Sequence, residues 1–280
     1  MDKFNKYVVC LIFMFNSCEK VHYYPDDPLP EPTQTRVMAH QAGGYCGGTP
    51  NTLEAAKMGL RKYDGIEVDV QLSSDNTIWL GHNYVLPSCG DFQSRIFRES
   101  SDMRIAHIDS CLGPEDNFST LDEVFQFMAD SFPDKYISID AKAWDPDDIK
   151  NMGVFGELRK VGEEIVKLRN RYQLKHVMVE SETASILKYI RRNSSDIETY
   201  LTTFGDYDRG MLIALYHEFT GLSFECKANN ISANHIKLLH LKGLKIQLWT
   251  VNDTALFNKV KNIDPDFIQT DLCEEEILNK

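Results

Sequence analysis

Two histidines and a pair of carboxylates are the residues of this sequence best suited to acid–base chemistry. Glu67 and Asp69 stand two positions apart in an apolar segment, with His40 before them and His82 after them. On a strand, residues at i and i+2 point to the same side, so the two carboxylates would share one face. Burying two like charges together is costly unless a cation compensates, which favours a hard divalent ion, Ca2+ or Mg2+, beside them.

These side chains can meet only if regular elements bring them to one place. From Arg36 onward, short apolar runs typical of strands alternate with segments of helical periodicity. The predicted strands are Arg36–His40, Gly65–Leu72 with a short extension at Trp79–Leu80, Tyr136–Asp140, Val177–Glu180, Thr199–Thr203, Leu222–Glu225, Lys245–Val251 and Phe267–Thr270. The predicted helices are Thr52–Lys62, Ser119–Ser131, Glu157–Arg171, Thr183–Arg192, Arg209–Tyr216, Ser232–Lys242 and Thr254–Lys261.

Counted with the extension as part of the second strand, this pattern gives eight strand–helix units. Eight units joined by helical crossovers favour a closed (β/α)8 TIM barrel, and no glycine-rich dinucleotide fingerprint supports an open sheet. Residues 83–118 are too long for an ordinary connection and are predicted to be an insertion after the second strand that covers one side of the barrel mouth. The carboxyl ends of barrel strands form the active-site face, which adds Asp140 and Lys142 to the candidates.

The first 34 residues are predicted to precede the barrel rather than belong to it. Lys3 and Lys6 come before the apolar run Tyr7–Phe15, which is far shorter than the ~20 residues of a membrane-spanning helix and is typical of an export signal. The segment up to Cys18 resembles a bacterial lipobox. We therefore expect a lipoprotein signal peptide at 1–18 with lipidated Cys18, a tether at 19–34 and a barrel at 35–280. This organisation predicts an exported protein, periplasmic or at the cell surface, anchored to the membrane through Cys18; a plain secretory signal is the alternative.

Charge and cysteine usage narrow the function further. The net charge of −12 argues against a surface that binds nucleic acid or an anionic membrane, but a bound cation would still let the protein take a small phosphodiester. The cysteines beyond Cys18 contain no CxxC pair, which makes a structural zinc site improbable. In an exported protein, Cys89 and Cys111 of the insertion are the favoured disulfide pair, and the odd number of the remaining cysteines leaves a thiol free or paired elsewhere.

The ordered set of short motifs between about Val37 and Asp271 resembles the glycerophosphodiester phosphodiesterase family. The motifs that carry the resemblance are His40-Gln41-Ala42-Gly43, Thr49-Pro50-Asn51-Thr52, Glu67-Val68-Asp69-Val70, His82-Asn83, Ser119-Thr120-Leu121-Asp122-Glu123, Asp140-Ala141-Lys142, Trp249-Thr250-Val251-Asn252 and Thr270-Asp271. The resemblance implies a TIM barrel and hydrolysis of a phosphodiester related to lipid metabolism.

The resemblance also assigns roles to individual residues. It implies that Glu67, Asp69 and Asp140 hold the metal ion and that His40 and His82 act as acid and base, in an order that the sequence leaves open. It places Lys142 beside the phosphate as a catalytic and substrate-binding cation. Trp249 would pack against the carbon skeleton of the substrate, with a barrel-core tryptophan as an equal alternative, and Gln41 would contact the phosphate.

The sequence departs from the family pattern at four motif positions. Gln41 replaces the arginine that grips the phosphate, Pro50 replaces a glutamate, Asp140 replaces a longer glutamate, and Asn83 replaces an aspartate. These changes predict an altered substrate grip. The insertion and the fourth strand offer further polar candidates, which are Arg95, Arg98, Arg104, His107 and Glu180.

Two other functions fit the same residues. Related barrels of the phosphatidylinositol phospholipase and sphingomyelinase D types cyclise their substrates, and the latter carry an Asp-x-Lys like Asp140-Ala141-Lys142. A lipoprotein that binds a headgroup or polyol without turnover would account for the lost motif residues.

Overall fold

The computed structural model describes residues 34–90, 93, 95–112, 118–142, 153–227 and 230–278, all within the compact unit Glu31–Lys280. The predicted signal peptide, Cys18 and nearly all of the tether lie outside the described residues. Among the described helices, none is both long and apolar enough to cross a membrane.

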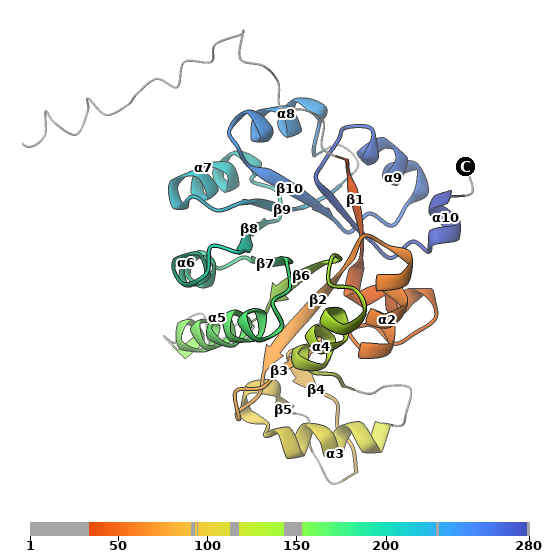
Figure 1. Cartoon of the computed structure of the whole chain (residues 1–280), viewed down its shortest axis with the longest axis vertical. Helices are drawn as coiled ribbons and strands as arrows, with labels where there is room; N and C mark the ends of the chain where they lie inside the picture. The colour runs from red at the N-terminus through yellow and green to blue at the C-terminus, as the bar shows by residue number, and fades with distance from the viewer. Residues whose placement is uncertain are drawn as a thin grey trace, which may run out of the picture. The chain divides into compact units, whose positions relative to one another are not determined.

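Eight parallel strands close into a barrel, which confirms the predicted fold class (Figure 1). The strands are β1 (Arg36–Ala39), β2 (Gly65–Leu72), β6 (Tyr136–Ala141), β7 (His176–Ser181), β8 (Ile197–Thr203), β9 (Gly221–Glu225), β10 (Lys245–Trp249) and β11 (Phe267–Thr270). Neighbours in the chain pair in turn, and the pairing of β1 with both β2 and β11 closes the ring. The strand ends that carry the predicted site residues therefore surround one opening.

Helices surround the strands (Figure 1). They are α2 (Leu53–Lys62), α4 (Leu121–Ser131), α5 (Gly153–Tyr172), α6 (Ala184–Asn193), α7 (Tyr207–His217), α8 (Ala233–Leu241), α9 (Thr254–Lys261) and α10 (Glu274–Leu278). Local sequence fixes where several of them begin. The side chain of Thr120 accepts a hydrogen bond from the backbone of Glu123, whose carboxylate accepts one in return from the Thr120 backbone, and this capping box starts α4.

Alternate positions on the strands face the barrel interior, and their character changes from one end of the barrel to the other. At the amino ends, Met38, Met178, Tyr200 and Phe267 form a small apolar cluster. Two residues further along β7, Glu180 is buried in a layer of polar side chains. The carboxyl ends carry the charged residues described below. The opposite strand faces are apolar and pack with the helices in the main core.

The predicted insertion at 83–118 has structure of its own. It follows β3 (Ile78–Leu80), which pairs antiparallel with β2, and contains the short pair β4 (Val85–Leu86) and β5 (Arg95–Ile96), the 3₁₀ turn η2 (Phe97–Glu99) and helix α3 (Asp102–Leu112). Its core consists of Leu86, Phe97, Ile105 and Ile108. The predicted disulfide between Cys89 and Cys111 is present.

A second disulfide joins Cys46 to Cys273, and Cys226 is a free, buried cysteine. The odd number of cysteines beyond Cys18 had left a second disulfide open, but the spacing of the cysteines did not indicate which two residues form it. Cys46 ends η1 (His40–Cys46), the irregular turn that follows β1, and Cys273 follows β11. The disulfide therefore links the loops on the two strands that close the barrel.

Candidate active site

A cavity of about 520 Å³ opens at the carboxyl ends of the strands. Seven of the eight predicted site residues line it, namely His40, Glu67, Asp69, His82, Asp140, Lys142 and Trp249. The insertion contributes Asn83 and Tyr84 to the same cavity. The fold thus gathers residues from positions 40 to 249 of the chain into one place.

The acidic cluster of Glu67, Asp69 and Asp140 lies on the neighbouring strands β2 and β6, where Asp69 and Asp140 are register partners. One carboxylate oxygen from each residue lies within 4.8 Å of the others. Glu67 and Asp69 are buried, and Asp140 is half-buried. Burial raises the pKa of the Glu67 carboxyl well above its usual value, and the negative charges of Asp69, Glu180 and Asp140 raise it further.

These residues fit a hard divalent cation. All three offer oxygen donors, and their combined negative charge exceeds the positive charge of Lys142, the lysine that lines the cavity within the described part of the chain. Carboxylate oxygens are the donors that Ca2+ and Mg2+ prefer, and a divalent ion would remove the cost of burying these like charges together. The donor set contains neither thiolate nor imidazole, which distinguishes it from a typical zinc site.

Lys142 bridges two members of the acidic cluster. Its Nζ lies 2.9 Å from Oδ1 of Asp69 and 3.2 Å from Oδ2 of Asp140. Burial opposes the charged ammonium, but the carboxylates of Asp140 and Asp69 outweigh burial and raise the pKa of Lys142 above its ordinary value. Lys142 is therefore a positive charge held beside the acidic cluster.

Asn51 fixes the orientation of Asp69. Its side-chain amide donates to Oδ2 of Asp69 at 2.8 Å, and its side-chain carbonyl accepts from the Asp69 backbone N–H at 3.0 Å. Asn51 belongs to the Thr49–Thr52 motif but was not predicted to be a site residue. Its place in that motif was the feature of the sequence that could have identified it as a site residue.

His40 is held by a carboxylate that the sequence analysis did not assign to the site. Its Nδ1 lies 2.7 Å from Oδ1 of Asp271, and its Nε2 lies 3.9 Å from Oε2 of Glu67. Asn252 secures Asp271, because its amide donates to Oδ2 at 2.5 Å and its carbonyl accepts from the Asp271 backbone at 2.8 Å. Asp271 belongs to the Thr270-Asp271 motif, and its place in that motif was the available signal in the sequence.

His82 has a different environment. Its side chain is exposed at the cavity, and its Nδ1 lies 3.3 Å from the side-chain oxygen of Asn83. The backbone before it is anchored, because Gly81 N–H donates to the Asp69 carbonyl at 2.9 Å. His82 therefore has a neutral partner where His40 has a carboxylate.

The predicted phosphate contact Gln41 is not among the residues that line the cavity. It is buried in left-handed backbone (φ 48°), its side-chain oxygen accepts from Tyr45 at 3.3 Å, and its backbone N–H donates to Oε2 of Glu67 at 2.9 Å. Its observed contact is thus with a carboxylate of the acidic cluster. The candidates Arg95, Arg98, Arg104 and His107 do not line the cavity either, and the insertion contributes Asn83 and Tyr84 to it instead.

Glu180 lies at the bottom of the cavity. Its carboxylate accepts hydrogen bonds from Ser138 at 2.9 Å, from Gln269 at 2.7 Å and from Ser223. Burial raises its pKa, while these three donors oppose the shift. Three hydrogen-bond donors therefore hold the Glu180 carboxylate in place inside the barrel.

The wall opposite the acidic cluster is aromatic. Trp249 ends β10 and Phe204 follows β8, on the far side of the ring of strands from β2 and β6. Their rings meet edge to face with centroids 5.4 Å apart. Tyr84 and Leu158 also line the cavity. A substrate held at the acidic cluster would extend its carbon skeleton towards this wall.

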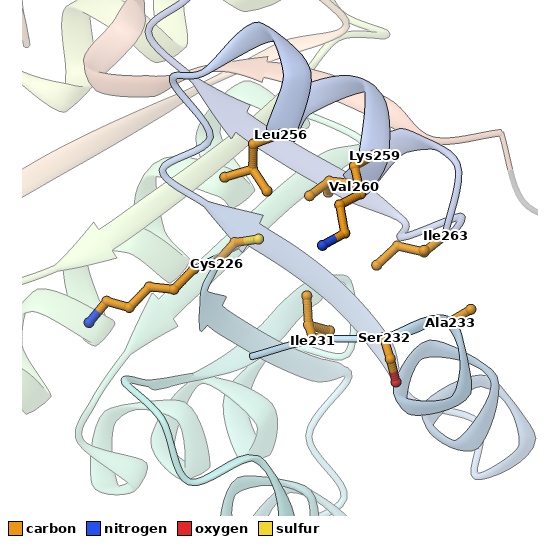
Figure 2. Close-up of a pocket in the computed structure, with 9 residues that line it drawn as sticks. Cys226, Ile231, Ser232, Ala233, Leu256, Lys259, Val260 and Ile263 are labelled. Atoms are coloured by element: carbon orange, nitrogen blue, oxygen red, sulfur yellow. The ribbon is translucent and has the colours of Figure 1, made fainter. Parts of the chain in front are cut away.

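A second, smaller cavity of about 320 Å³ lies outside this site (Figure 2). Residues from the end of β9, the start of α8 and helix α9 line it, including Cys226, Ile231, Leu256 and Lys259. Burial raises the pKa of the Cys226 thiol to about 11, so the thiol is protonated at neutral pH and is a poor nucleophile. None of the predicted site residues lines this cavity.

Comparison with known proteins identifies the family of this chain. The model of the glycerophosphoryl diester phosphodiesterase family matches residues 42–275. No curated protein matches the sequence significantly.

Solved structures share the fold at low sequence identity. A glycerophosphodiester phosphodiesterase from Parabacteroides distasonis has a TM-score of 0.71 at 21% identity, covering 88% of this chain and 96% of that one. An Oleispira antarctica phosphodiesterase in complex with its product sn-glycerol-3-phosphate has a TM-score of 0.72 at 15% identity, with the same coverage. A Thermotoga maritima glycerophosphodiester phosphodiesterase has a TM-score of 0.67 at 19% identity, again covering 88% and 96%. Because the family match spans most of the chain, the protein belongs to the glycerophosphoryl diester phosphodiesterase family and is a phosphoric diester hydrolase.

Proposed function

We propose that the protein hydrolyses a glycerophosphodiester, or a related lipid headgroup, in a metal-dependent reaction with His40 and His82 as base and acid. The observation that carries this proposal is the shared cavity, in which three clustered carboxylates, one lysine and two histidines face the same space. The product complex of the Oleispira antarctica phosphodiesterase, whose fold is similar, supports a substrate of this class.

Glu67, Asp69 and Asp140 would hold the ion, Ca2+ or Mg2+. When bound, the ion supplies positive charge that stabilises the negative charge developing on the phosphate. Lys142 adds a second positive charge on the same side of the cavity. Together these two charges would offer a way to bind phosphate without the family arginine that Gln41 replaces.

The hydrogen bond between His40 and Asp271 supports His40 as the base. The Nδ1–H of His40 donates a hydrogen bond to Oδ1 of Asp271, so neutral His40 keeps its lone pair on Nε2, the atom that faces Glu67. Nε2 can then take a proton from the attacking water. His82, which is exposed in the same cavity and contacts the neutral side chain of Asn83, would then protonate the departing alcohol.

We also propose that the protein is exported and anchored through lipidated Cys18. The N-terminal sequence supports this location, and so do two disulfides, because such bonds persist mainly outside the cytosol. Radiolabelled palmitate incorporated into wild type but not into Cys18→Ser would support the anchor, whereas equal labelling of both would contradict it.

Phosphorus NMR on a panel of glycerophosphodiesters tests the reaction itself. We expect sn-glycerol-3-phosphate as the product when Ca2+ or Mg2+ is present. A cyclic phosphate that accumulates as the final product would instead indicate the cyclising chemistry of the related barrels. Binding of a headgroup without any new phosphorus signal would indicate a non-catalytic receptor.

A further inference from the structure

We propose that the Cys46–Cys273 disulfide positions His40 for catalysis by holding the loop of His40 against the loop of Asp271. The disulfide would then support turnover as well as stability. The inference rests on the proposed function of His40 as an acid–base group, and it adds a positioning element that lies outside the cavity.

The geometry brings both loops to one point. The last register pair between β1 and β11 is Ala39 with Thr270, and the chain continues from there into His40 on one side and Asp271 on the other. Beyond this pair the strands no longer hold the two segments together. The links across the gap include the His40–Asp271 hydrogen bond, a 3.7 Å contact between Cys46 Sγ and the Asp271 carbonyl oxygen, and the disulfide, whose Cα atoms are 5.5 Å apart.

The loop of His40 needs such a restraint because its backbone is strained. Gln41 and Ala42 both adopt left-handed backbone, with φ of 48° and 65°, and the following Gly43 has φ of 87°. Residues other than glycine occupy this region only at a cost, and they stay there when the surroundings fix them. The Gln41 N–H bond to Glu67 fixes one end of the turn, and the disulfide at Cys46 fixes the other.

The loop of Asp271 is likewise held close to Cys273. The hydroxyl of Tyr63 donates to the carbonyl of Leu272 at 2.6 Å, and the Cys273 N–H donates to Oε2 of Glu276 at 2.7 Å. Loss of the disulfide would leave Asp271 anchored through Asn252 but would release the His40 loop from it. The distance between Nδ1 and Oδ1 would then fluctuate, and Nε2 would lose its fixed direction into the cavity.

A pair of double variants tests the inference. Cys46→Ser/Cys273→Ser removes the proposed positioning disulfide, and Cys89→Ser/Cys111→Ser removes the disulfide of the insertion as a matched control. With sn-glycero-3-phosphocholine and Ca2+, at a temperature well below both melting transitions, we expect the first variant to lose about tenfold in kcat with KM within twofold, as for other residues that orient a ligand group. The control should keep the wild-type kcat.

A spectroscopic readout separates positioning from activity. In 15N-histidine-labelled protein, the Nδ1–H proton of His40 should give a downfield signal in wild type and in the control, and this signal should be broadened or lost in Cys46→Ser/Cys273→Ser. Wild-type kcat together with an unchanged His40 signal in that variant would overturn the inference. Wild-type protein that shows no turnover would refute the proposed function, while the His40 signal would still decide the inference.

A second route covers the case in which Cys46→Ser/Cys273→Ser does not fold. The control variant keeps one disulfide, so dithiothreitol acts on that bond alone. Two electrons and two protons convert it to the thiols of Cys46 and Cys273, while the reductant closes to its cyclic disulfide. We expect kcat and the His40 signal to fall as these thiols become open to alkylation, before circular dichroism changes. Loss of activity only together with loss of circular dichroism would overturn the inference.

Discussion

Removing the two disulfides separately should destabilise the fold by different amounts, because they close loops of very different length. Cys46 and Cys273 are 227 residues apart, whereas Cys89 and Cys111 are 22 apart. In the chain-entropy treatment, the longer closure restricts the unfolded chain by about 5 kcal/mol and the shorter by about 3 kcal/mol at 25 °C. Cys46→Ser/Cys273→Ser should therefore be about 2 kcal/mol less stable than Cys89→Ser/Cys111→Ser.

Guanidinium unfolding followed by tryptophan fluorescence measures this difference. The free energies of unfolding of wild type and both variants, extrapolated to water, should fall in the order of loop length, and the melting temperatures of the two variants should differ by about 4–8 °C. Equal losses, or a larger loss in the insertion variant, would refute the reasoning. Such a result would mean that the strain or packing of each bond, rather than its loop length, sets its contribution.

Two further predictions concern charged pairs. Lys142→Met should bind Ca2+ about tenfold more tightly in isothermal titration calorimetry, because the substitution removes a positive charge within 3.2 Å of both Asp69 and Asp140. The turnover of this variant should fall. An unchanged Ca2+ affinity would show that Lys142 does not compete with the ion. The 2.9 Å hydrogen bond from His240 to Asp266 raises the pKa of His240 in the folded protein above the value of about 6.5 in the unfolded chain. The interaction therefore stabilises the fold fully below the unfolded-chain pKa, and this stabilisation is lost as the pH rises through the pKa of His240 in the folded protein. His240→Gln should therefore remove part of the stability decline between pH 6 and pH 8, and parallel pH curves for the two proteins would contradict this.

The strand pattern predicted most of the site because barrel geometry follows from periodicity. Glu67, Asp69 and Asp140 all lie on strands that could be predicted from the sequence, and they occupy the alternate positions that face the barrel interior. Once eight such strands are closed into a ring, their carboxyl ends must surround one opening. The gathering of the three carboxylates at one opening therefore follows from strand positions and parity, whereas their assignment as metal ligands came from the resemblance to the phosphodiesterase family.

Features that depend on contacts between distant loops were harder to predict from the sequence. Nothing in the spacing of Cys46 and Cys273 indicates that they meet, because their proximity arises only when β1 pairs with β11. Asp271 lies one residue beyond the last strand, so its contact with His40 depends on the same closure. The direction of the Gln41 side chain depends on left-handed backbone that the residue type does not favour.

The insertion was located but its internal structure was not predicted. Its strands β4 and β5 have two residues each, too few to show alternation. Its stability comes from a small separate apolar cluster and from the Cys89–Cys111 disulfide. Only the disulfide could be predicted, because both cysteines lie within the same segment.

The metal and histidine requirements of phosphodiester hydrolysis test the central claim most directly. Initial rates with sn-glycero-3-phosphocholine should be measured for wild type, His40→Ala and Glu67→Gln, with His217→Ala on α7 as a histidine control outside the cavity. We predict that wild type and the control lose activity in EDTA and regain it with Ca2+ or Mg2+, and that kcat falls at least about 100-fold in the two site variants. Full activity of wild type in EDTA, or of His40→Ala with metal present, would contradict the proposed mechanism.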